Sequence, residues 1–417
     1  MPGASGSWSA AVVAPPVRGT RSGRAAGLAA LWWAAGIVAA LLHAGLWATP
    51  NLETFASAAA AFPGAPPAAG GPGDYVLATL STIGLGHLTG WTDPHEFARL
   101  HLLLVVAVTA GLVALAWRRG GLVLARGLAV VLAASPLVSV SLQWLGQPDI
   151  VTGGSALAAV LVRRRRWIVV LGLVAGWTHP EQALLAFAGV VLIRWAWPEP
   201  DLTESGPAEA RRRLALDATA AIGSVLFAAV TARIWLAAAG ITISRSRVEF
   251  LELGLPAFAE HHAAAPAALV WNLLGALWLL VAGLGAAAAW TRWRPGGGRL
   301  ALSGLAVAVA ALVPTFLTLD ETRVFAVLTA PALAAIAWFV ARLPERLGPW
   351  AAAVTLVISA MIPAGFSTGT SVWRHRLDSR AMATFLVDGS RPEDAPALSL
   401  WLLAPLEVRI PTLPGGD

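Results

Sequence analysis

The residues best suited to chemistry in this chain are the few polar side chains that interrupt long apolar runs. The clearest case is the stretch from Gln143 to Asp149, which lies between two such runs. A carboxylate this close to hydrocarbon is costly unless it faces protein or a water-filled cavity. Pro148 prevents a helix from running straight through, because its ring lacks an N–H and clashes with the preceding turn. We predict a tight hairpin at the membrane edge with Gln147 and Asp149 at its tip. Asp149 either stabilises the turn or belongs to a functional site.

A second Pro-bearing turn carries the same kinds of side chain. His179 and Glu181 flank Pro180 between two short apolar runs. A Pro at the first helical position and a Glu in the first turn also mark an ordinary helix start. Two short hairpins that follow each other in the chain would present their tips side by side. His179 and Glu181 are therefore candidates for binding a polar substrate.

Asp320 and Arg323 stand at the start of a later apolar run. Asp320 can cap the helix that begins there. An Arg at a helix start opposes the helix macrodipole, so Arg323 needs another reason to be there. A guanidinium group is a rigid bidentate partner for anions such as phosphate. We therefore predict that Arg323 meets an anionic ligand.

Three further candidates also have structural explanations. Asp74 follows Gly-Gly-Pro-Gly and precedes an amphipathic stretch, so it is either a helix cap or a catalytic base. Arg233 lies near the end of an apolar run, from where it either snorkels to the interface or reaches the same site. Arg245 and Glu249, four residues apart, suit a surface salt bridge as well as an anion site.

Several kinds of chemistry are absent from the sequence. The motifs GxxxxGK[ST] and HExxH do not occur, and the chain has no Cys. His261 and His262 have no third ligand at useful spacing, so we predict no metal site and no cofactor, although a divalent cation is compatible with the proposed chemistry. The pI near 11.2 would suggest nucleic acid in a soluble protein, but here the basic residues flank apolar runs, so we predict no nucleic-acid partner.

The elements that position these residues are apolar helices. The chain has 417 residues, of which 57% are hydrophobic and 12% charged, with a mean hydropathy of +0.69. This composition predicts an all-α polytopic integral membrane protein with about eleven transmembrane helices, some of them short or re-entrant. The predicted spans lie at about residues 27–48, 99–117, 127–142, 150–162, 167–178, 183–197, 215–237, 267–290, 300–318, 324–341 and 349–366. Residues 76–88 read as a helix in the membrane interface.

The distribution of charge predicts the orientation. All 29 basic residues are Arg, which we interpret as a codon bias of a GC-rich, bacterial genome, and most of them flank the side that holds the N-terminus. Because basic loops are retained inside, we predict a plasma-membrane protein with its N-terminus inside. The predicted organisation is a disordered cytoplasmic segment 1–26, a membrane domain 27–366 with outer loops 49–98 and 238–266, and an extracytoplasmic tail 367–417. All the candidate residues named above then lie on the extracytoplasmic side.

This layout resembles the GT-C class of polytopic membrane glycosyltransferases, which includes mannosyltransferase-like and polysaccharide-assembly membrane proteins. The resemblance covers residues 27–366. It consists of an Arg-flanked first span, a long outer loop ending in Gly73-Asp74-Tyr75, outward Pro turns at Gln147-Pro148-Asp149 and His179-Pro180-Glu181, and a late outer Arg323. The chain departs from the class in lacking a paired Asp-Asp or Asp-Glu in the first outer loop and a large soluble C-terminal domain.

The resemblance implies transfer of a sugar from a polyprenyl-phosphate donor to a glycan, lipid or protein acceptor, as in cell-envelope polysaccharide biosynthesis. The acid of the first outer loop corresponds to Asp74, with Glu53 as second choice. Asp74 or Asp149 would then act as the base, and Arg323, Arg233 or Arg245 would stabilise the lipid phosphate. Gln147, His179, Glu181 and Asp320 would complete substrate binding, and membrane lipids would surround the bundle.

Other functions fit the same pattern. A transporter or flippase of a lipid-linked or anionic substrate would use broken helices and charges near mid-depth, usually in repeated halves. Here the charges gather at one rim of the predicted bundle, and no halves are evident. Another lipid-linked transferase or polymerase, or a non-catalytic scaffold of envelope assembly, are the remaining alternatives.

Overall fold

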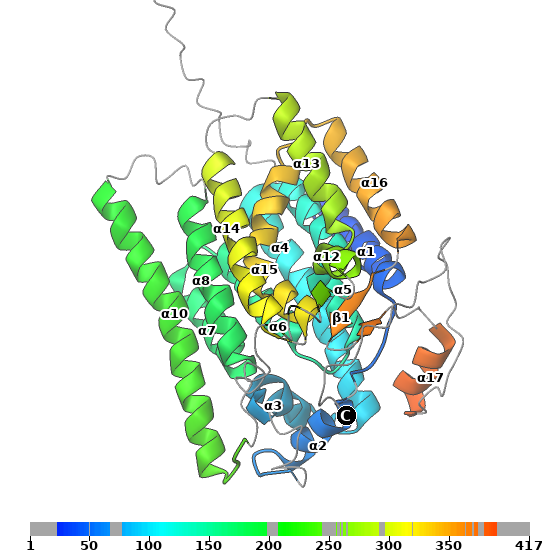
Figure 1. Cartoon of the computed structure of the whole chain (residues 1–417), viewed down its shortest axis with the longest axis vertical. Coiled ribbons are helices and arrows are strands. Elements are labelled where there is room, and N and C mark those ends of the chain that lie inside the picture. Colours follow the sequence, from blue (N-terminus) through cyan, green and yellow to red (C-terminus); the bar gives the residue numbers. More distant parts are fainter. Residues whose placement is uncertain are drawn as a thin grey trace, which may run out of the picture.

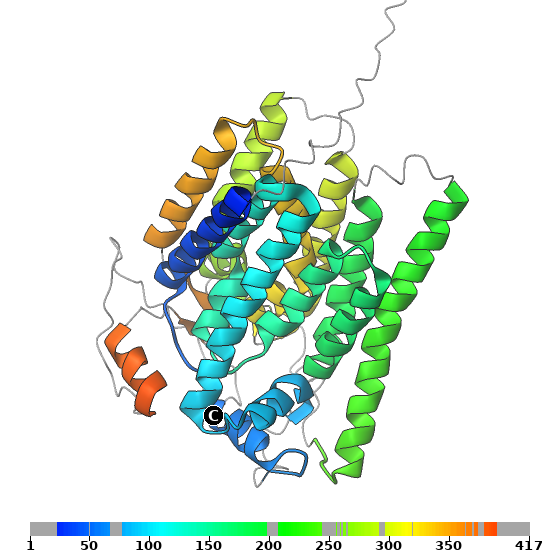
Figure 2. The same cartoon turned by 180° about the vertical axis from the view of Figure 1, so that it is seen from behind.

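The computed structural model describes most of the chain as a bundle of helices. The described residues are 23–49, 51–66, 77–197, 207–243, 266–291, 297–318, 320–362, 364–368, 371–373 and 379–389, together with 256, 259, 262 and 263. Figures 1 and 2 show the bundle from opposite sides.

Long apolar helices form the body of the protein. Those long and apolar enough to cross a membrane are α1 (Gly23–Ala44), α4 (Pro94–Ala134), the Arg211–Ala238 part of α10 (Pro207–Ala238), α14 (Gly297–Phe316) and α15 (Glu321–Val340). This confirms a multi-pass, helical membrane protein. The number of about eleven spans and the inside N-terminus remain predictions.

Shorter helices fill the space between the long ones. They are α5 (Pro136–Gln143), α6 (Asp149–Leu161), α7 (Arg165–Thr178), α8 (Pro180–Ala196), α12 (Pro266–Leu274), α13 (Leu277–Thr291) and α16 (Leu347–Met361). Two predicted spans are interrupted. The run 127–142 breaks at Pro136, where Ser135 is extended. The run 267–290 breaks at Gly275, which has a φ of +53° that only glycine adopts readily.

Helix α4 is a helical hairpin in one continuous segment. Gly120 and Gly121 have non-helical dihedrals, and Gly121 has φ 69° and ψ −165°. Glycine tolerates this left-handed region without steric cost. The chain therefore reverses there, as Figure 2 shows at the upper end of the cyan helix. Gly127, after the turn, packs on the Ala337 carbonyl near the end of α15.

The remaining elements lie at one end of the bundle. Helices α2 (Leu52–Ala61) and α3 (Leu80–Thr89) lie across its lower end in Figure 1. Helix α3 corresponds to the predicted interfacial helix. Helix α17 (Ser379–Asp388) packs on α4. A hairpin of β1 (Phe366–Thr368) and β2 (Ser371–Trp373) is the one departure from the all-α expectation in the described chain. The predicted boundaries at 26 and 367 stay predictions.

Helix α15 is the centre of the structure. It packs against α4, α6, α8 and α14, and 89% of its apolar window is buried. Gly153 of α6 allows close approach, since a Cβ there would lie 3.3 Å from the Ala330 Cβ of α15. Helix α10, in contrast, lies at the edge of the bundle against α7 and α8 (Figure 1). The core thus surrounds α6 and α15, whose first residues carry the polar side chains.

Candidate functional site

The loop between α5 and α6 is held by hydrogen bonds to the segment after α1. The Leu145 N–H donates to the Trp47 carbonyl at 2.9 Å, and the Thr49 N–H donates to the Leu145 carbonyl at 2.9 Å. Gly146 has a φ of +106°, and a Cβ there would lie 2.7 Å from Leu52 of α2. The loop therefore requires glycine at this point, both for its backbone conformation and for space. Pro148 ends it, and α6 begins at Asp149.

Asp149 and Arg323 form a two-pronged ion pair between α6 and α15. Arg323 Nε lies 2.8 Å from Asp149 Oδ2, and Arg323 Nη2 lies 3.2 Å from Asp149 Oδ1. The two side chains are only 1% and 6% exposed, respectively. Parallel guanidinium–carboxylate bonds of this kind fix orientation as well as distance. The pair therefore sets the position of the first turns of α6 and α15.

Arg323 binds two more polar groups. Its Nη1 lies 2.8 Å from Asp320 Oδ2, and its Nη2 donates to Gln147 Oε1 at 2.9 Å. The Trp144 ring centroid lies 5.0 Å from its Cζ, a cation–π distance. We call Gln147, Asp149, Asp320 and Arg323 the Asp149–Arg323 site. Four of the predicted site residues thus come together.

The site changes the interpretation of two of these residues. Asp320 stands at the N-cap position of α15, but its side chain makes no capping hydrogen bond, because its carboxylate binds Arg323. Arg323 was predicted to meet an anionic ligand. In the structure its anionic partners are two carboxylates of the chain itself. Two carboxylates against one guanidinium leave these three side chains with an excess of one negative charge.

His101 of α4 lies beside this site and was not among the predicted residues. Its side chain is 1% exposed, and its Nδ1 lies 2.9 Å from the Phe97 carbonyl, so Nδ1 carries the proton. Its ring interacts electrostatically with Asp149. Two turns further along α4, Val108 packs at Gly154 of α6. That register places His101 level with the start of α6. His101 lies inside an apolar run, where a lone polar residue gives no local signal of a site.

Glu321 and His262 form a carboxylate–imidazole contact next to the site. Glu321 follows Asp320 directly, and its side chain is 1% exposed. His262 Nδ1 lies 3.7 Å from Glu321 Oε1, and His262 Nε2 lies 3.1 Å from the Phe316 carbonyl. Within the described residues, no group of three or more His, Asp or Glu has the geometry to hold a metal ion.

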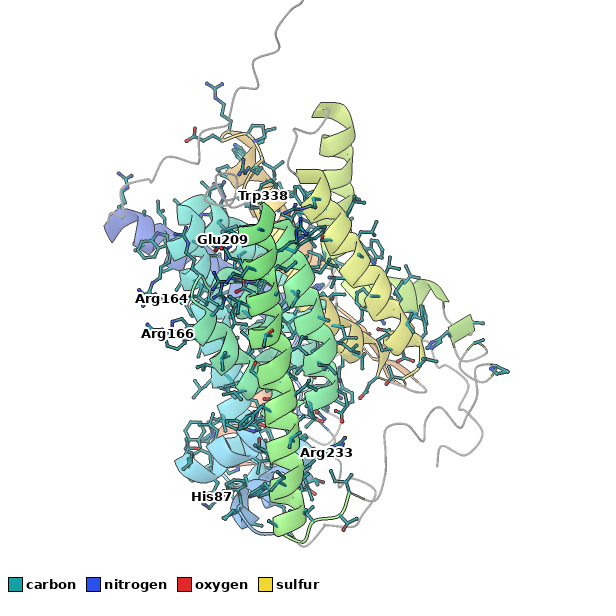
Figure 3. All side chains as sticks on the ribbon, turned by 90° about the vertical axis from the view of Figure 1, so that its left-hand side faces the viewer. His87, Arg164, Arg166, Glu209, Arg233 and Trp338 are labelled. Carbon is teal, nitrogen blue, oxygen red and sulfur yellow. The ribbon has the colours of Figure 1, made fainter. Side chains whose placement is uncertain are left out.

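The other predicted residues lie on other helices or outside the described chain. His179 is buried at the start of α8, where its Nδ1 lies 3.2 Å from Gln182 Oε1. Glu181 is exposed in the first turn of α8. Arg233 is exposed on the edge helix α10, as Figure 3 shows. Asp74 and Arg245 fall outside the described residues. Glu53 is exposed in the first turn of α2.

Three helices begin at the end of the bundle that holds the site. Helices α6, α8 and α15 pack against one another, and each runs away from this end. The N-terminus of a helix carries a partial positive charge, which favours the carboxylates of Asp149, Glu181 and Glu321 in the first turns. The arrangement offers carboxylate acceptors and one guanidinium in a water-poor setting, which suits proton transfer and stabilisation of a developing negative charge.

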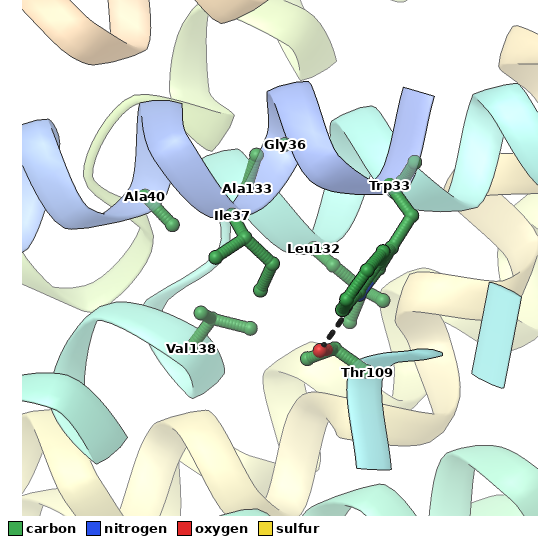
Figure 4. Close-up of a pocket in the computed structure, with 9 residues that line it drawn as sticks. Trp33, Gly36, Ile37, Ala40, Thr109, Leu132, Ala133 and Val138 are labelled. Carbon is green, nitrogen blue, oxygen red and sulfur yellow. Dashed lines mark hydrogen bonds between the residues drawn. The ribbon is translucent and has the colours of Figure 1, made fainter. Parts of the chain in front are cut away.

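A small apolar pocket lies elsewhere in the bundle. It is enclosed by α1, α4 and α5 and lined by Trp33, Ile37, Leu132 and Val138, among others (Figure 4). Its cavity volume is about 10 Å³, room for about one water molecule. The Trp33 Nε1–H donates to Thr109 Oγ1 at 3.1 Å. With no charged residue in its lining, the pocket has no part in the chemistry of the Asp149–Arg323 site.

No protein-family model matches the chain, and no curated protein matches it significantly. Among solved structures it is similar to the crystal structure of ArnT from Cupriavidus metallidurans in the apo state, with a TM-score of 0.36 and 18% sequence identity over 79% of this chain. The chain spans 62% of that protein. A similarity of this size carries no conclusion about activity, which rests on the residues of the site.

Proposed function

We propose that the protein is a GT-C-type membrane glycosyltransferase. In this proposal it transfers a sugar from a polyprenyl-phosphate donor to a glycan, lipid or protein acceptor at the end of the bundle that holds the Asp149–Arg323 site. The observation that carries the proposal is the buried, two-pronged pair of Asp149 and Arg323, supported by Gln147 and Asp320. Buried ionisable residues in a membrane domain usually mark a substrate site.

The reaction requires one proton acceptor and one cation. The acceptor hydroxyl oxygen attacks the anomeric carbon of the donor sugar, the bond from that carbon to the phosphate oxygen breaks, and the hydroxyl proton moves to a carboxylate. Asp74 and Asp149 are the two candidates for this base. The leaving polyprenyl phosphate keeps the bonding electrons, and its negative charge is stabilised by Arg323.

The geometry suggests how the phosphate reaches Arg323. Of the two carboxylates on this guanidinium, Asp149 is 1% exposed and Asp320 is 39% exposed. The phosphate would replace Asp320 on Nη1, while Asp149 keeps its two bonds to Nε and Nη2. The charge of the cluster then stays unchanged, since one anion replaces another.

The test is sugar transfer by the purified protein in proteoliposomes. A panel of polyprenyl-phosphate sugars is supplied with crude envelope acceptors, and labelled product is measured. Arg323→Gln should lower the rate by about 100-fold or more, because a preorganised charge partner of the leaving group is lost. One of Asp74 and Asp149 is the base in this proposal. Replacing that residue with Asn should lower the transfer rate by roughly 100-fold to 10,000-fold.

Asp217 supplies a matched control. It is a carboxylate of α10 that binds two arginines, Arg165 at 2.8 Å and Arg194 at 2.8 Å, at the opposite end of the bundle. Asp217→Asn should leave the transfer rate per folded molecule unchanged. Movement of donor lipid across the liposome membrane without transfer would favour the transporter alternative. Equal rates in wild type and all three site variants would exclude the Asp149–Arg323 site as catalytic.

A further inference from the structure

The end of the bundle opposite the Asp149–Arg323 site carries a turn of four consecutive arginines, residues 163–166, between α6 and α7. All four side chains are exposed. Arg165 binds Asp217 of α10 at 2.8 Å. Arg163, Arg164 and Arg166 have no ion-pair partner among the residues that the structure describes. Positive charge at the start of a helix opposes the macrodipole of α7, and an anion from outside the described chain would offset this opposition.

The turn is recessed because the helices that carry it are short. Helix α6 has 13 residues and α7 has 14, which at 1.5 Å per residue span about 20 Å. The hydrocarbon core of a bilayer is about 30 Å thick. The far end of α7 is tied to the interfacial helix α3, since Thr178 Oγ1 lies 2.5 Å from Ser81 Oγ. With α3 at the membrane interface, as the sequence predicts, the arginine turn would stop about 10 Å short of the opposite membrane surface.

The neighbouring helix shows the same recess. Arg165 is level with Asp217, whereas α10 begins ten residues earlier, at Pro207. Figure 3 shows Arg164 and Arg166 on the flank of the bundle, lower than Glu209 of α10. Ten helical residues correspond to about 15 Å. The arginines thus lie below the rim that α10 reaches.

The surface directly below the arginines is apolar and exposed. Trp167, Val169 and Val170 of α7 are 49%, 36% and 43% exposed. The Arg166 guanidinium carbon lies 5.7 Å from the Trp167 ring centroid. A phospholipid matches this order of groups, because its phosphate would meet the arginines while its acyl chains cover the apolar residues below. Arginine binds phosphate with a rigid two-pronged geometry.

Two other arginines at this end, Arg119 and Arg194, are already engaged. Arg194 Nη1 donates to the Val162 carbonyl at 2.6 Å and Arg119 Nη1 to the Val160 carbonyl at 2.6 Å, which caps the C-terminus of α6. Arg194 also binds Asp217 at 2.8 Å. Arg163, Arg164 and Arg166 differ from Arg165 and Arg194 in having no ion-pair partner in the described chain.

We propose that the recessed turn, Arg163, Arg164 and Arg166, binds the phosphates of anionic phospholipids and draws their headgroups toward the bilayer centre. The proposal is independent of the glycosyltransferase activity. Local thinning of the bilayer is the usual response to a span that is too short. A basic residue near an anionic membrane surface favours binding by about 5-fold.

Native mass spectrometry of the protein released from nanodiscs tests the proposal. The discs contain equal amounts of phosphatidylglycerol and phosphatidylcholine, and the retained lipids are counted. The wild-type protein should retain phosphatidylglycerol in preference to phosphatidylcholine. Arg164→Gln/Arg166→Gln should lower this preference by about 25-fold, which is about 5-fold for each arginine. The matched control is Arg211→Gln/Arg212→Gln, which removes two exposed arginines from the start of α10 and should leave most of the preference.

A second measurement tests the recess and does not depend on lipid retention during release. The thermal stability of wild type should be higher in discs of short-chain phosphatidylglycerol than in long-chain discs, and the turn variant should lose this difference. Equal retention of the two lipids by wild type would overturn the proposal, as would equal loss in the two double variants. Displacement of phosphatidylglycerol by inorganic phosphate at low concentration would show a site for the free anion instead.

Discussion

Asp149 and Arg323 are separated by 174 residues in the chain and meet as a buried pair. Removing Arg323 leaves Asp149 as an uncompensated buried charge, which usually costs about 3 to 5 kcal/mol, whereas removing Asp149 leaves Arg323 paired with Asp320 at 2.8 Å. We expect Arg323→Gln to destabilise the protein by an amount of this order and Asp149→Asn to destabilise it by less, measured as thermal unfolding in detergent. Replacing both partners with apolar residues, as in Asp149→Leu/Arg323→Met, should restore much of the stability, because apolar packing often equals a buried ion pair.

The double variant separates stability from activity. If the pair serves only to hold α6 against α15, the restored protein should have the transfer rate of wild type. If the pair belongs to the site, the restored protein should fold and be inactive. Single variants as stable as wild type would contradict the buried pairing of Asp149 with Arg323.

His101 supports a second prediction at the scale of single residues. Its Nδ1 binds the Phe97 carbonyl, and its buried Nε2 has no hydrogen-bond partner among the described residues. An unsatisfied buried acceptor costs about 1 to 3 kcal/mol. His101→Phe removes that acceptor and keeps the aromatic contact with Phe97, whose ring centroid lies 4.6 Å away. We expect the variant to raise the free energy of unfolding by about 1 kcal/mol in the absence of substrate.

The comparison for this change is His101→Ala, which removes the acceptor and the ring together. It should destabilise the protein, because a cavity is left in place of the imidazole. A loss of stability in His101→Phe itself would mean that Nε2 has a hydrogen-bond partner in the membrane, and the prediction would be wrong.

At the scale of elements, α7 and α10 depend on two glycines for their close contact. A Cβ on Gly172 would lie 2.0 Å from Ser224 Oγ, and a Cβ on Gly176 would lie 2.7 Å from the Ala228 Cβ and 2.9 Å from the Val225 carbonyl. Small residues of this kind let membrane helices approach closely. Gly176→Val should therefore separate α10 from α7 and destabilise the protein by about 1 to 3 kcal/mol, measured by thermal unfolding.

Gly223 is the matched control on α10. Nothing lies within 4 Å of its Cβ position, so Gly223→Ala should be neutral or stabilising by up to about 1 kcal/mol, since alanine favours a helix over glycine. If Gly176→Val left stability unchanged, α10 would not pack on α7 as closely as the structure has it.

The short helices show which helix positions can be predicted from the sequence. The spans predicted at 150–162, 167–178 and 183–197 correspond to α6, α7 and α8 within a few residues. Their ends are marked locally, by Pro148 and Pro180 and by the arginines of residues 163–166. The reversal of α4 at Gly120 and Gly121 falls between the spans predicted at 99–117 and 127–142. The break of α12 from α13 at Gly275 was missed, because an isolated glycine in an apolar run is common.

At the scale of the whole molecule, the orientation in the membrane is open to a direct measurement. The chain has no cysteine, so a single introduced cysteine reports on its own position. Thr89 is exposed at the end of α3, near the Asp149–Arg323 site, and Arg211 is exposed at the start of α10, at the arginine-rich end. The excess of arginine predicts that the second end is cytoplasmic.

A membrane-impermeant maleimide should therefore label Thr89→Cys in intact cells and Arg211→Cys only after the membrane is opened. Wild type, without cysteine, measures the background. The opposite labelling pattern would place the Asp149–Arg323 site in the cytoplasm, and a lipid-linked donor on the outer face would then be excluded.

The sequence by itself determined the class of protein, the position of most helices and the turns at which polar residues appear. These features are local, because apolar periodicity, proline and glycine act within a few residues. The tertiary structure alone decided which polar residues meet. It brought Arg323 to Asp149, Asp320 and Gln147, set His101 beside them, and left Glu181 and Arg233 exposed. The physical reason is that side chains far apart in the chain meet only through the packing of α4, α6 and α15, which is the joint result of many apolar contacts and is encoded in no single motif.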